Sequence, residues 1–343
     1  MKTIATLLAL AVVALAVGSP PVAAQQKLAQ TGMKFLSVGT DARFSAMANG
    51  VSAIESGSPS AVFYNPASMA RFDVTARAAV GYTKWIADIA HYYGAIGISP
   101  ADGDWGTFTL FYQYVDYGTI TGTIRSAGGK GYLDSRDVPG LDVKPSGTVF
   151  GLGYARAISD KFSIGATVKY AMQNLGDATV DYTGGNATTV NTTANVLAFD
   201  LGLIYRTGFR SLNIAMAIRN FSREVQYAKE NVQLPLLFKL GAAVDMVELT
   251  EGEKGESSVL VTVDAEHPRD YQEQLRFGTE FIYQSLLALR MGYVTGLEEE
   301  GLSLGFGLMT TLGGAPFGLD YAYTPVGPLG DVHRLTFNFA MPR

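Results

Sequence analysis

FSIGATVKYAMQ, residues 162–173, alternates apolar side chains with polar or small ones along its whole length. Successive side chains of a β-strand point to opposite faces, so this segment has one apolar face and one polar or small face. In a soluble sandwich the polar face meets water and is rich in Lys, Glu and Thr. In the segments of this chain that repeat the pattern, Gly and Ala dominate that face, with one or two charges per strand. Small residues suit the crowded inside of a barrel and the apolar face suits lipid, which predicts a membrane-spanning strand.

The same alternation recurs to the end of the chain and predicts an all-β membrane protein. We expect an antiparallel outer-membrane β-barrel of about fourteen strands, an even number as in other single-chain bacterial barrels, with a short, partly helical N-terminal plug. The expected strands are 72–84, 88–99, 105–117, 147–158, 161–174, 195–207, 210–222, 235–248, 256–266, 272–283, 285–295, 301–311, 315–324 and 331–341.

The lengths of the connections predict the orientation of the barrel. Long connections at 118–146, 175–194 and 223–234 follow the third, fifth and seventh strands, whereas very short ones follow even-numbered strands. Outer-membrane barrels have short periplasmic turns and long external loops. We therefore expect a multi-pass protein of the outer membrane with both termini in the periplasm. The short connection at 84–88 is the exception, because the scheme places it outside.

The N-terminus reads as a cleaved signal peptide. Lys2, an apolar run at 4–17 and Val22-Ala23-Ala24 supply the basic, apolar and small-residue regions of such a peptide, which we expect to span residues 1–24. The run is shorter than the roughly 20 residues that a spanning helix needs.

The chain has no cysteine, which excludes disulfides. It has 31 acidic against 26 basic residues and no basic cluster, which argues against a nucleic-acid partner.

Residues 25–71 precede the first expected strand and remain to be placed. About fourteen strands enclose a lumen wider than side chains alone can fill, so we expect residues 25–71 to form a plug and residues 72–343 the barrel. Asp41 is a suitable N-cap for a helix that continues to Val51, and Asn65-Pro66 ends the helical region and turns the chain into the first strand. A simple loop is the alternative reading of this turn. The plug motif that we single out comprises Arg43, Asn65, Pro66 and Ala67.

Charged residues at inward-facing positions of the expected strands form a second candidate site. Both signs occur in comparable number, which favours an ion-pair network that braces the wall and anchors the plug, with Arg43 as one partner, over a polar permeation path. These residues are Lys169, Asp200, Arg219, Lys239, Asp245, Asp264, Glu266, Arg276, Glu280, Arg290 and Asp320.

The sequence offers little for catalysis or cofactor binding. It has three histidines, His91, His267 and His333, and no G-x-S-x-G elbow accompanies them. AGGKGYL (127–133) lacks the Ser or Thr that follows the lysine of a phosphate loop, and GLEEEG (296–301) is better read as a solvated acidic loop than as a calcium site. We expect no enzyme, no cofactor and no metal.

Two longer stretches resemble a known family. GTDARFSAMANGVSAIESGSPSAVFYNPASMAR (39–71) and LDYAYTPVGPLGDVHRLTFNF (319–339) resemble the N-terminal signature and the closing hairpin of the PorV/PorQ family, which belongs with the FadL-like fourteen-stranded barrels. Ser68 and Met69 stand where that family commonly has Gly and Leu, and Ala48-Asn49 replaces a Gly pair. The resemblance implies a role in type IX secretion. There, PorV-like barrels bind the C-terminal domain of secreted cargo and carry it from the translocon to a surface-attachment complex, and PorQ-like members hold a surface partner.

Three functions stay open at this point, because a fold alone does not give a function. The first is a non-enzymatic secretion component that lies in outer-membrane lipid and binds protein through its long loops. The second is a FadL-like transporter that admits hydrophobic small molecules past the plug. It predicts an apolar pocket for which Phe35, Leu36, Phe44, Met47 and Phe63 are the candidates, although we favour the reading that these residues pack the plug against the wall. The third is a structural barrel without a ligand. The expected partner-binding residues of the loops are Tyr117, Tyr132, Leu133, Tyr182, Val225, Tyr227 and Leu234.

Overall fold

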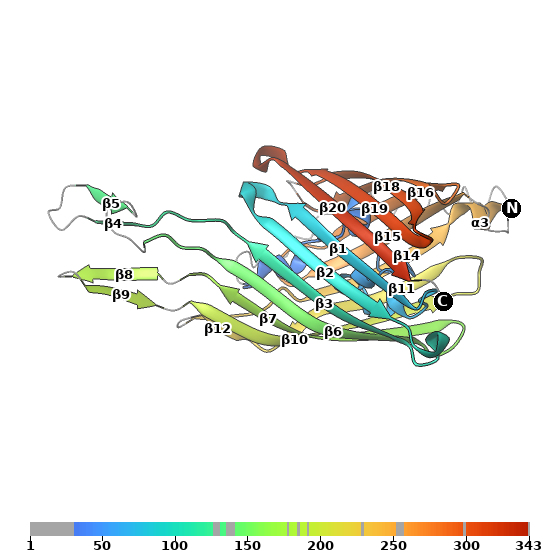
Figure 1. Ribbon diagram of the computed structural model, residues 1–343, viewed down its shortest axis with the longest axis horizontal. Helices are drawn as coiled ribbons and strands as arrows, with labels where there is room; N and C mark the ends of the chain where they lie inside the picture. Colours follow the sequence, from blue (N-terminus) through green and yellow to red (C-terminus); the bar gives the residue numbers. More distant parts are fainter. Residues whose placement is uncertain are drawn as a thin grey trace.

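The alternating segments form fourteen antiparallel strands that close into one barrel (Figure 1). The computed structural model describes residues 31–125, 131–134, 141–176, 178–183, 186–190, 192–227, 230–251, 257–297 and 300–341. Each barrel strand pairs with the next one along the chain, and the last returns to pair with the first. The barrel strands are β1 (Ala76–Lys84), β2 (Ala90–Ile98), β3 (Thr107–Asp116), β6 (Ser146–Ala157), β7 (Phe162–Asn174), β10 (Thr193–Arg206), β11 (Asn213–Ser222), β14 (Leu237–Asp245), β15 (Ser258–Pro268), β16 (Gln274–Tyr283), β17 (Leu287–Thr295), β18 (Leu302–Leu312), β19 (Ala315–Pro325) and β20 (Asp331–Met341).

The expected fold is confirmed, because alternation of period two marks each strand independently of its neighbours. The predicted strand ends differ from the observed ones by a few residues; the largest difference is at β1, which begins at Ala76 rather than at residue 72. On β7 the apolar side chains of Phe162 and Ile164 are exposed on the outer surface, whereas Ser163 and Lys169 are buried inside. The outer face is therefore the apolar one, as a lipid-facing wall requires.

The two ends of the barrel differ. Three two-stranded hairpins extend the connections after β3, β7 and β11, and two of them project well beyond the barrel at the left of Figure 1. They are β4 (Thr123–Arg125) with β5 (Tyr132–Asp134), β8 (Ala178–Thr183) with β9 (Asn186–Val190), and β12 (Val225–Tyr227) with β13 (Glu230–Val232). We call this the loop end. We call the other end the turn end. It carries the connections that follow β2, β6, β10, β14, β16 and β18, which are the even barrel strands in chain order. The helix α3 (Met246–Glu251) and Met341 also lie at this end.

Residues 33–72, which we call the inner segment, lie inside the barrel (blue in Figure 1) and are almost entirely buried. The helix α2 contacts β17 to β20, η2 contacts β1 to β3, and η3 contacts β6, β7 and β10. The expected signal peptide, residues 1–24, and residues 25–30 of the expected plug lie outside the described residues. The short helices are η1 (Lys34–Ser37), α2 (Ala42–Ala46), η2 (Pro59–Phe63), η3 (Pro66–Met69), η4 (Ile86–Asp88), η5 (Ala101–Gly103) and η6 (Gly327–Leu329).

The expected helix begins where predicted but is shorter. Asp41 caps α2 by accepting a hydrogen bond from the Phe44 backbone N–H, at 3.0 Å. The helix ends at Ala46 instead of reaching residue 51, because Ala48 and Asn49 have left-handed φ values of 52° and 58° that cannot continue a right-handed helix.

The turn at Asn65-Pro66 also differs from the expectation. Asn65 is extended, as a residue before proline should be, but Pro66 opens η3 instead of leading directly into the first strand. Inward-facing glycines let this turn approach the wall. A Cβ atom at Gly165 of β7 would collide with the backbone of Pro66 and Ala67.

We predict that Gly165→Val lowers the free energy of unfolding by about 3 kcal/mol, the upper end of the usual effect of overpacking, because backbone lies on both sides of the new methyl groups. Denaturant unfolding of the purified protein in detergent measures this. Gly94→Val is the matched control: Gly94 lies on the outer face of β2, where the nearest atom to an added Cβ, in Val80, is 3.9 Å away. Equal losses in the two variants would contradict the close approach at Gly165.

Candidate functional site

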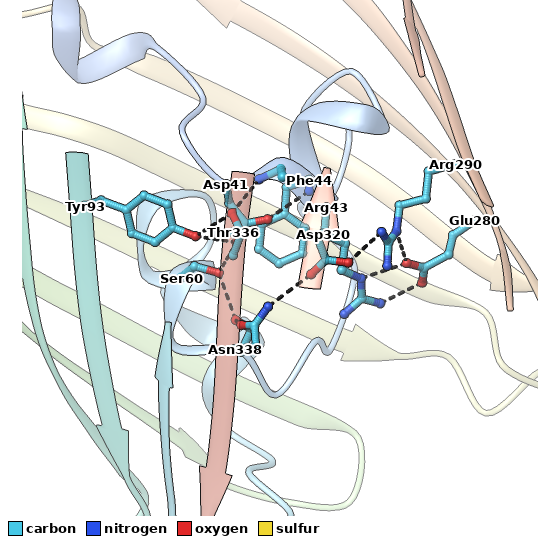
Figure 2. A network of polar contacts seen from close by, with 12 residues as sticks. Asp41, Arg43, Phe44, Ser60, Tyr93, Glu280, Arg290, Asp320, Thr336 and Asn338 are labelled. Atoms are coloured by element: carbon cyan, nitrogen blue, oxygen red, sulfur yellow. Dashed lines mark hydrogen bonds and ion pairs between the residues drawn. The ribbon is translucent and has the colours of Figure 1, made fainter. Parts of the chain in front are cut away.

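Asp41 is the centre of the polar contacts that hold the first half of the inner segment. Its side chain is buried, and besides capping α2 it accepts hydrogen bonds from the Ser60 hydroxyl, at 2.7 Å, and from the Tyr93 hydroxyl of β2, at 2.9 Å (Figure 2). At the next residue of the chain, the Ala42 backbone N–H donates a hydrogen bond to the Thr336 hydroxyl of β20, at 3.0 Å. One carboxylate thus joins α2, the start of η2 and the wall.

A chain of alternating charges runs from α2 into the wall (Figure 2). Arg43 binds Glu280 of β16 through two parallel hydrogen bonds, of 2.8 and 2.7 Å. Glu280 also accepts a hydrogen bond from Arg290 of β17, at 2.6 Å, and Arg290 donates at 2.7 Å to Asp320 of β19. The Asn338 amide donates to the second oxygen of Asp320, at 3.0 Å. Glu280 is 1% exposed and neutralises two guanidinium groups at once, so the wall and the inner segment share one buried anion.

Four buried cations of the wall bind the inner segment in a different way, by donating to its backbone carbonyl oxygens. These carbonyls belong to residues that leave regular structure, where no backbone donor is available. The contacts are Arg219 to Leu36 at 3.1 Å, Arg334 to Gly39 at 2.9 Å, Arg276 to Ala48 at 2.9 Å and Lys239 to Asn49 at 3.0 Å.

Three more carboxylates lie deeper in the wall, and two of them pair with cations. Glu266 pairs with both Lys239 and Arg276, at 2.8 and 2.9 Å. Asp200 pairs with Lys169, at 2.7 Å, and both groups also contact Asn220. The third, Asp264, accepts hydrogen bonds from the backbone N–H and the hydroxyl of Ser52 in the inner segment.

Within the described residues, Asp245 is the one predicted inward charge that makes neither an ion pair with the wall nor a hydrogen bond to the inner segment. It is the last residue of β14 and accepts hydrogen bonds from the backbone N–H groups of Val247 and Glu248, so it caps α3 at the turn end. Its position in the alternation predicts an inward side chain, but the strand ends at this residue and a helix begins. The expectation that Asp245 belongs to the ion-pair network is therefore wrong.

Asn65 secures the second half of the inner segment. It is fully buried, accepts a hydrogen bond from the Ala67 backbone N–H at 3.0 Å and donates to the Ser52 carbonyl at 2.7 Å. Nearby, Glu55 pairs with Arg71 of the same segment and with Arg206 of β10. Sequence reasoning singled out neither Glu55 nor the Asp41 contacts with the wall. Tyr93 and Thr336 occupy inward-facing positions of their strands, and a polar residue at such a position is the sequence signal for a contact of this kind.

The environment fixes the charge states of Arg43 and Tyr64 in the inner segment at physiological pH. Burial alone lowers the pKa of the Arg43 guanidinium, but the carboxylate of Glu280 outweighs it, and the pKa is raised above its ordinary value. Burial raises the pKa of Tyr64 to about 12, and the charge of Asp41 adds to this effect. Arg43 is therefore charged and Tyr64 is neutral.

The predicted partner-binding residues fall into two groups. Tyr132 on β5 is 79% exposed, and Leu133 is half-buried beside it. Val225 and Leu234, in contrast, are buried in the core beneath the loop end, and this corrects the expectation that they are surface anchors. The cause is that the chain around β12–β13 folds inward over the mouth, where the Gly32 backbone N–H donates to the Gln233 carbonyl at 2.9 Å.

Two more of these residues take part in an internal contact. The Tyr227 hydroxyl donates to Gln173 of β7, at 2.6 Å, and the Gln173 amide donates to Tyr117, at 3.4 Å. Both tyrosines pack partly buried against the core. The side chain of Tyr182 lies outside the described residues.

Two cavities open at opposite ends of the barrel. The cavity at the turn end, about 530 Å³, is lined by Arg43, Arg290 and Asp320 among others. The cavity at the loop end, about 520 Å³, is lined by residues that include Trp85 and Arg334. The apolar residues considered for a ligand pocket do not line this second cavity but pack in the core, in line with the favoured reading of them, and they are Phe35, Leu36, Phe44, Met47 and Phe63.

Nothing in the described part of the chain forms a metal centre from three or more His, Asp or Glu side chains. His91 is buried against the ring of Trp85, while His267 contacts Glu273 and His333 contacts Tyr321. Within the same residues, no helix is long and apolar enough to cross a membrane.

Residues 125–339 match the family of the type IX secretion system membrane protein PorP/SprF. The match covers more than half of the chain. The chain belongs to this family. The expected role in the type IX system thus finds support at the level of the family, but the PorV/PorQ assignment is not confirmed. One of the two stretches behind that resemblance, residues 39–71, lies outside the part that matches PorP/SprF. No curated protein sequence matches the chain.

Solved structures with a similar fold confirm that this PorP/SprF family member has a FadL-like outer-membrane barrel. The CymD monoaromatic hydrocarbon channel is 10% identical, with 89% of this chain and 98% of that chain covered and a TM-score of 0.55. A Pseudomonas aeruginosa FadL homologue is 12% identical, with 88% and 99% covered and a TM-score of 0.52. The Ralstonia pickettii toluene transporter TbuX is 15% identical, with 88% and 97% covered and a TM-score of 0.50. Identities this low show the fold alone.

We predict that Glu280→Gln destabilises the protein more than Arg43→Gln does. The first variant leaves Arg43 without its carboxylate and Arg290 with Asp320 alone, and should cost about 3–5 kcal/mol. In the second, Glu280 keeps Arg290 and the Arg43 side chain is 23% exposed, so we expect about 1–2 kcal/mol. Denaturant unfolding measures both, and Arg223→Gln, an exposed residue at the loop end, is the control. A greater loss in Arg43→Gln would refute the bridging role of Glu280.

We predict that Asn65→Asp destabilises the protein at neutral pH by about 3 kcal/mol, because the new carboxylate faces the Ser52 carbonyl without a donor. Burial raises the folded-state pKa of such a carboxylate, so the folded state binds its proton more tightly than the unfolded state, whose pKa is about 3.9. Stability should therefore fall as the pH rises above about 4, and acid should restore it.

Unfolding of Asn65→Asp at a series of pH values tests this, with Asn174→Asp at an exposed position as the control. A loss that does not change with pH in the first variant would contradict the assigned contact.

Proposed function

We propose that this barrel is a non-enzymatic component of type IX protein secretion that binds a protein partner at its loop end. The observation that carries the proposal is the PorP/SprF family match together with the position of the hairpins. All three hairpins leave neighbouring strand pairs, β3–β6, β7–β10 and β11–β14, whereas the remaining loops of that end are short. Two of them, β4–β5 and β8–β9, project beyond the barrel on one side of the mouth, and the chain around β12–β13 folds inward beside them.

The chemistry of the mouth supports a protein partner. Tyr132 and Ile120, which are 79% and 55% exposed, offer the aromatic and aliphatic side chains that protein interfaces favour. In this proposal the loop end faces outward and both termini face the periplasm, as the short turns of outer-membrane barrels do. The partner is secreted cargo with its C-terminal domain, the translocon or a surface-attachment protein. The resemblance of residues 39–71 to the PorV/PorQ signature supports the first of these.

In the same proposal the inner segment acts as a plug. An open barrel of fourteen strands would leak, and residues 33–72 fill the lumen between the two end cavities. Its contacts with the wall are charge-assisted and buried, which favours a fixed plug over a permeation path.

Site-specific crosslinking tests this function. A photoreactive residue at Tyr132 should crosslink a component of the secretion machinery or a secreted protein in whole cells, and mass spectrometry identifies the product. The matched control is Phe209, which is 63% exposed at the turn end and should not give that product. Crosslinks to lipid alone at both positions would refute the proposal.

The alternative function is transport of hydrophobic small molecules past the inner segment. The fold that this chain shares with hydrocarbon channels and transporters favours it. Transport would require the inner segment to move, which breaks the Arg43–Glu280 pair and the wall contacts to its carbonyls. An apolar ligand that co-purifies with the protein, without any protein partner, would support this alternative instead.

A further inference from the structure

The strands of the β8–β9 hairpin pair only with each other within the described residues. The hairpin follows β7 and precedes β10, and its register runs from Ala178↔Val190 to Thr183↔Asn186. Figure 1 shows it projecting from the loop end of the barrel. An isolated two-stranded hairpin is only marginally stable in water, so a third strand would stabilise this one.

The outer edges of the two strands differ. An edge strand presents unpaired backbone N–H and C=O groups, and native proteins block such edges with charges, prolines or β-bulges. β8 has two of these features, because it contains Asp181 and its register shifts between Thr179 and Asp181. β9 contains no charge, proline, glycine or bulge, and its two Thr and one Val favour extended structure. The edge of β9 is therefore the one that is open to another strand.

This open edge continues from β9 into the first residues of β10. Residues 194–197 of β10 pair with residues 170–173 of β7 on one side. On the other side the ladder with β11 begins only at Ala198, which pairs with Ser222. Beyond Ser222 the chain leads to β12, which pairs with β13 instead of β10. Every second N–H and C=O group of residues 194–197 thus lies on a side where no described strand pairs with it.

A cavity leaves space for a strand at this edge. Its volume is about 280 Å³, and it is lined by residues 193–195 of β10 and by residues 223–226, which lead into β12. The other side of the hairpin is covered at its base, since a Cβ atom at Gly176, just before β8, would collide with Val143. Space for a further strand therefore lies on the side of β9 and β10.

We propose that the edge formed by β9 and residues 194–197 of β10 binds an extended segment of the protein partner, which adds to the hairpin as a third strand. This inference rests on the function proposed above, because it assigns the way in which that same partner is recognised. A row of backbone donors and acceptors is complementary to another extended backbone, which selects a protein segment over a lipid or a small molecule. The edge carries no charge between residues 186 and 197, so an uncharged segment rich in β-branched residues suits it best.

Site-specific photocrosslinking in whole cells tests this mode of binding. A photoreactive residue placed in turn at Ala187, Thr188 and Thr189 of β9 should give adducts with the partner, and mass spectrometry of the crosslinked peptides locates the partner residue in each. If two strands pair, that residue shifts by about one position, in a constant direction, with each step along β9. The matched control is Thr179 of β8, which pairs directly with Thr189 and should give much less of the adduct.

Proline substitutions test the backbone contacts. Thr189→Pro and Val190→Pro each remove one N–H group of β9, and one of these two groups lies on the open edge because successive N–H groups point to opposite sides. Thr179→Pro and Ala178→Pro are the matched controls, since these residues are the direct partners of the first two in the hairpin. We expect one β9 variant to lower the yield of the Tyr132 crosslink to the partner about tenfold relative to its β8 control, through the lost hydrogen bond and the bulk of the ring. Unfolding in denaturant checks that the barrel of each variant is intact.

Three results would overturn the inference. The first is a set of β9 adducts that scatter over the partner without a constant step, and the second is an equal effect of the β8 and β9 prolines in both pairs. The third is β9 adducts with a second copy of this chain instead of the partner. If Tyr132 crosslinks the partner while β9 crosslinks lipid alone, the inference fails and the proposed function stands. If neither Tyr132 nor β9 yields a protein adduct, both fail.

Discussion

The structure depends on one constraint, the need to fill a lumen that fourteen strands make too wide for their own side chains. The inner segment meets this need, but much of its backbone lies outside its four short helices and is buried inside the barrel. Every buried carbonyl and N–H group of that backbone needs a partner. The wall supplies them at inward positions: Arg334 and Lys239 donate to carbonyls, Thr336 accepts from an N–H, and glycines such as Gly165 give the room for direct approach.

The charges inside the barrel follow from this arrangement. A cation that is buried in order to reach a carbonyl carries a desolvation cost, which only a nearby carboxylate offsets. Glu266 serves Lys239 and Arg276 in this way, and Glu280 serves Arg43 and Arg290. Mixed signs along the lumen are therefore what anchoring requires. Moving the inner segment would break the Arg43–Glu280 pair and the contacts of the wall cations with its carbonyls together, whereas Lys239, Arg276 and Arg290 would keep their carboxylates within the wall.

How much of this could be predicted depends on the range of the interactions concerned. Strands were predictable because alternation is local, and Asp41 as a helix cap is local as well. The early end of α2 depends on left-handed φ values at Ala48 and Asn49, residues whose side chains do not demand that conformation. Val225 is buried because its hairpin folds back over the mouth. The alternation of side chains inside a loop does not show which way the loop folds. Likewise, which carboxylate Arg43 meets depends on the barrel register across strands far apart in sequence.

The barrel is polarised around its circumference. The ion pairs of α2 lie against β16 to β20, whereas the three hairpins belong to the sector from β3 to β14 (Figure 1). In a closed sheet each strand is held by two neighbours, so a change in a loop or on the outer wall of one sector leaves the contacts of the opposite sector intact. The projecting hairpins β4–β5 and β8–β9 can therefore differ in length and sequence without loosening the ion pairs of α2. This separation lets one fold keep a fixed interior while its loop end is adapted to a particular partner, which is why the FadL-like fold alone does not determine what the barrel binds.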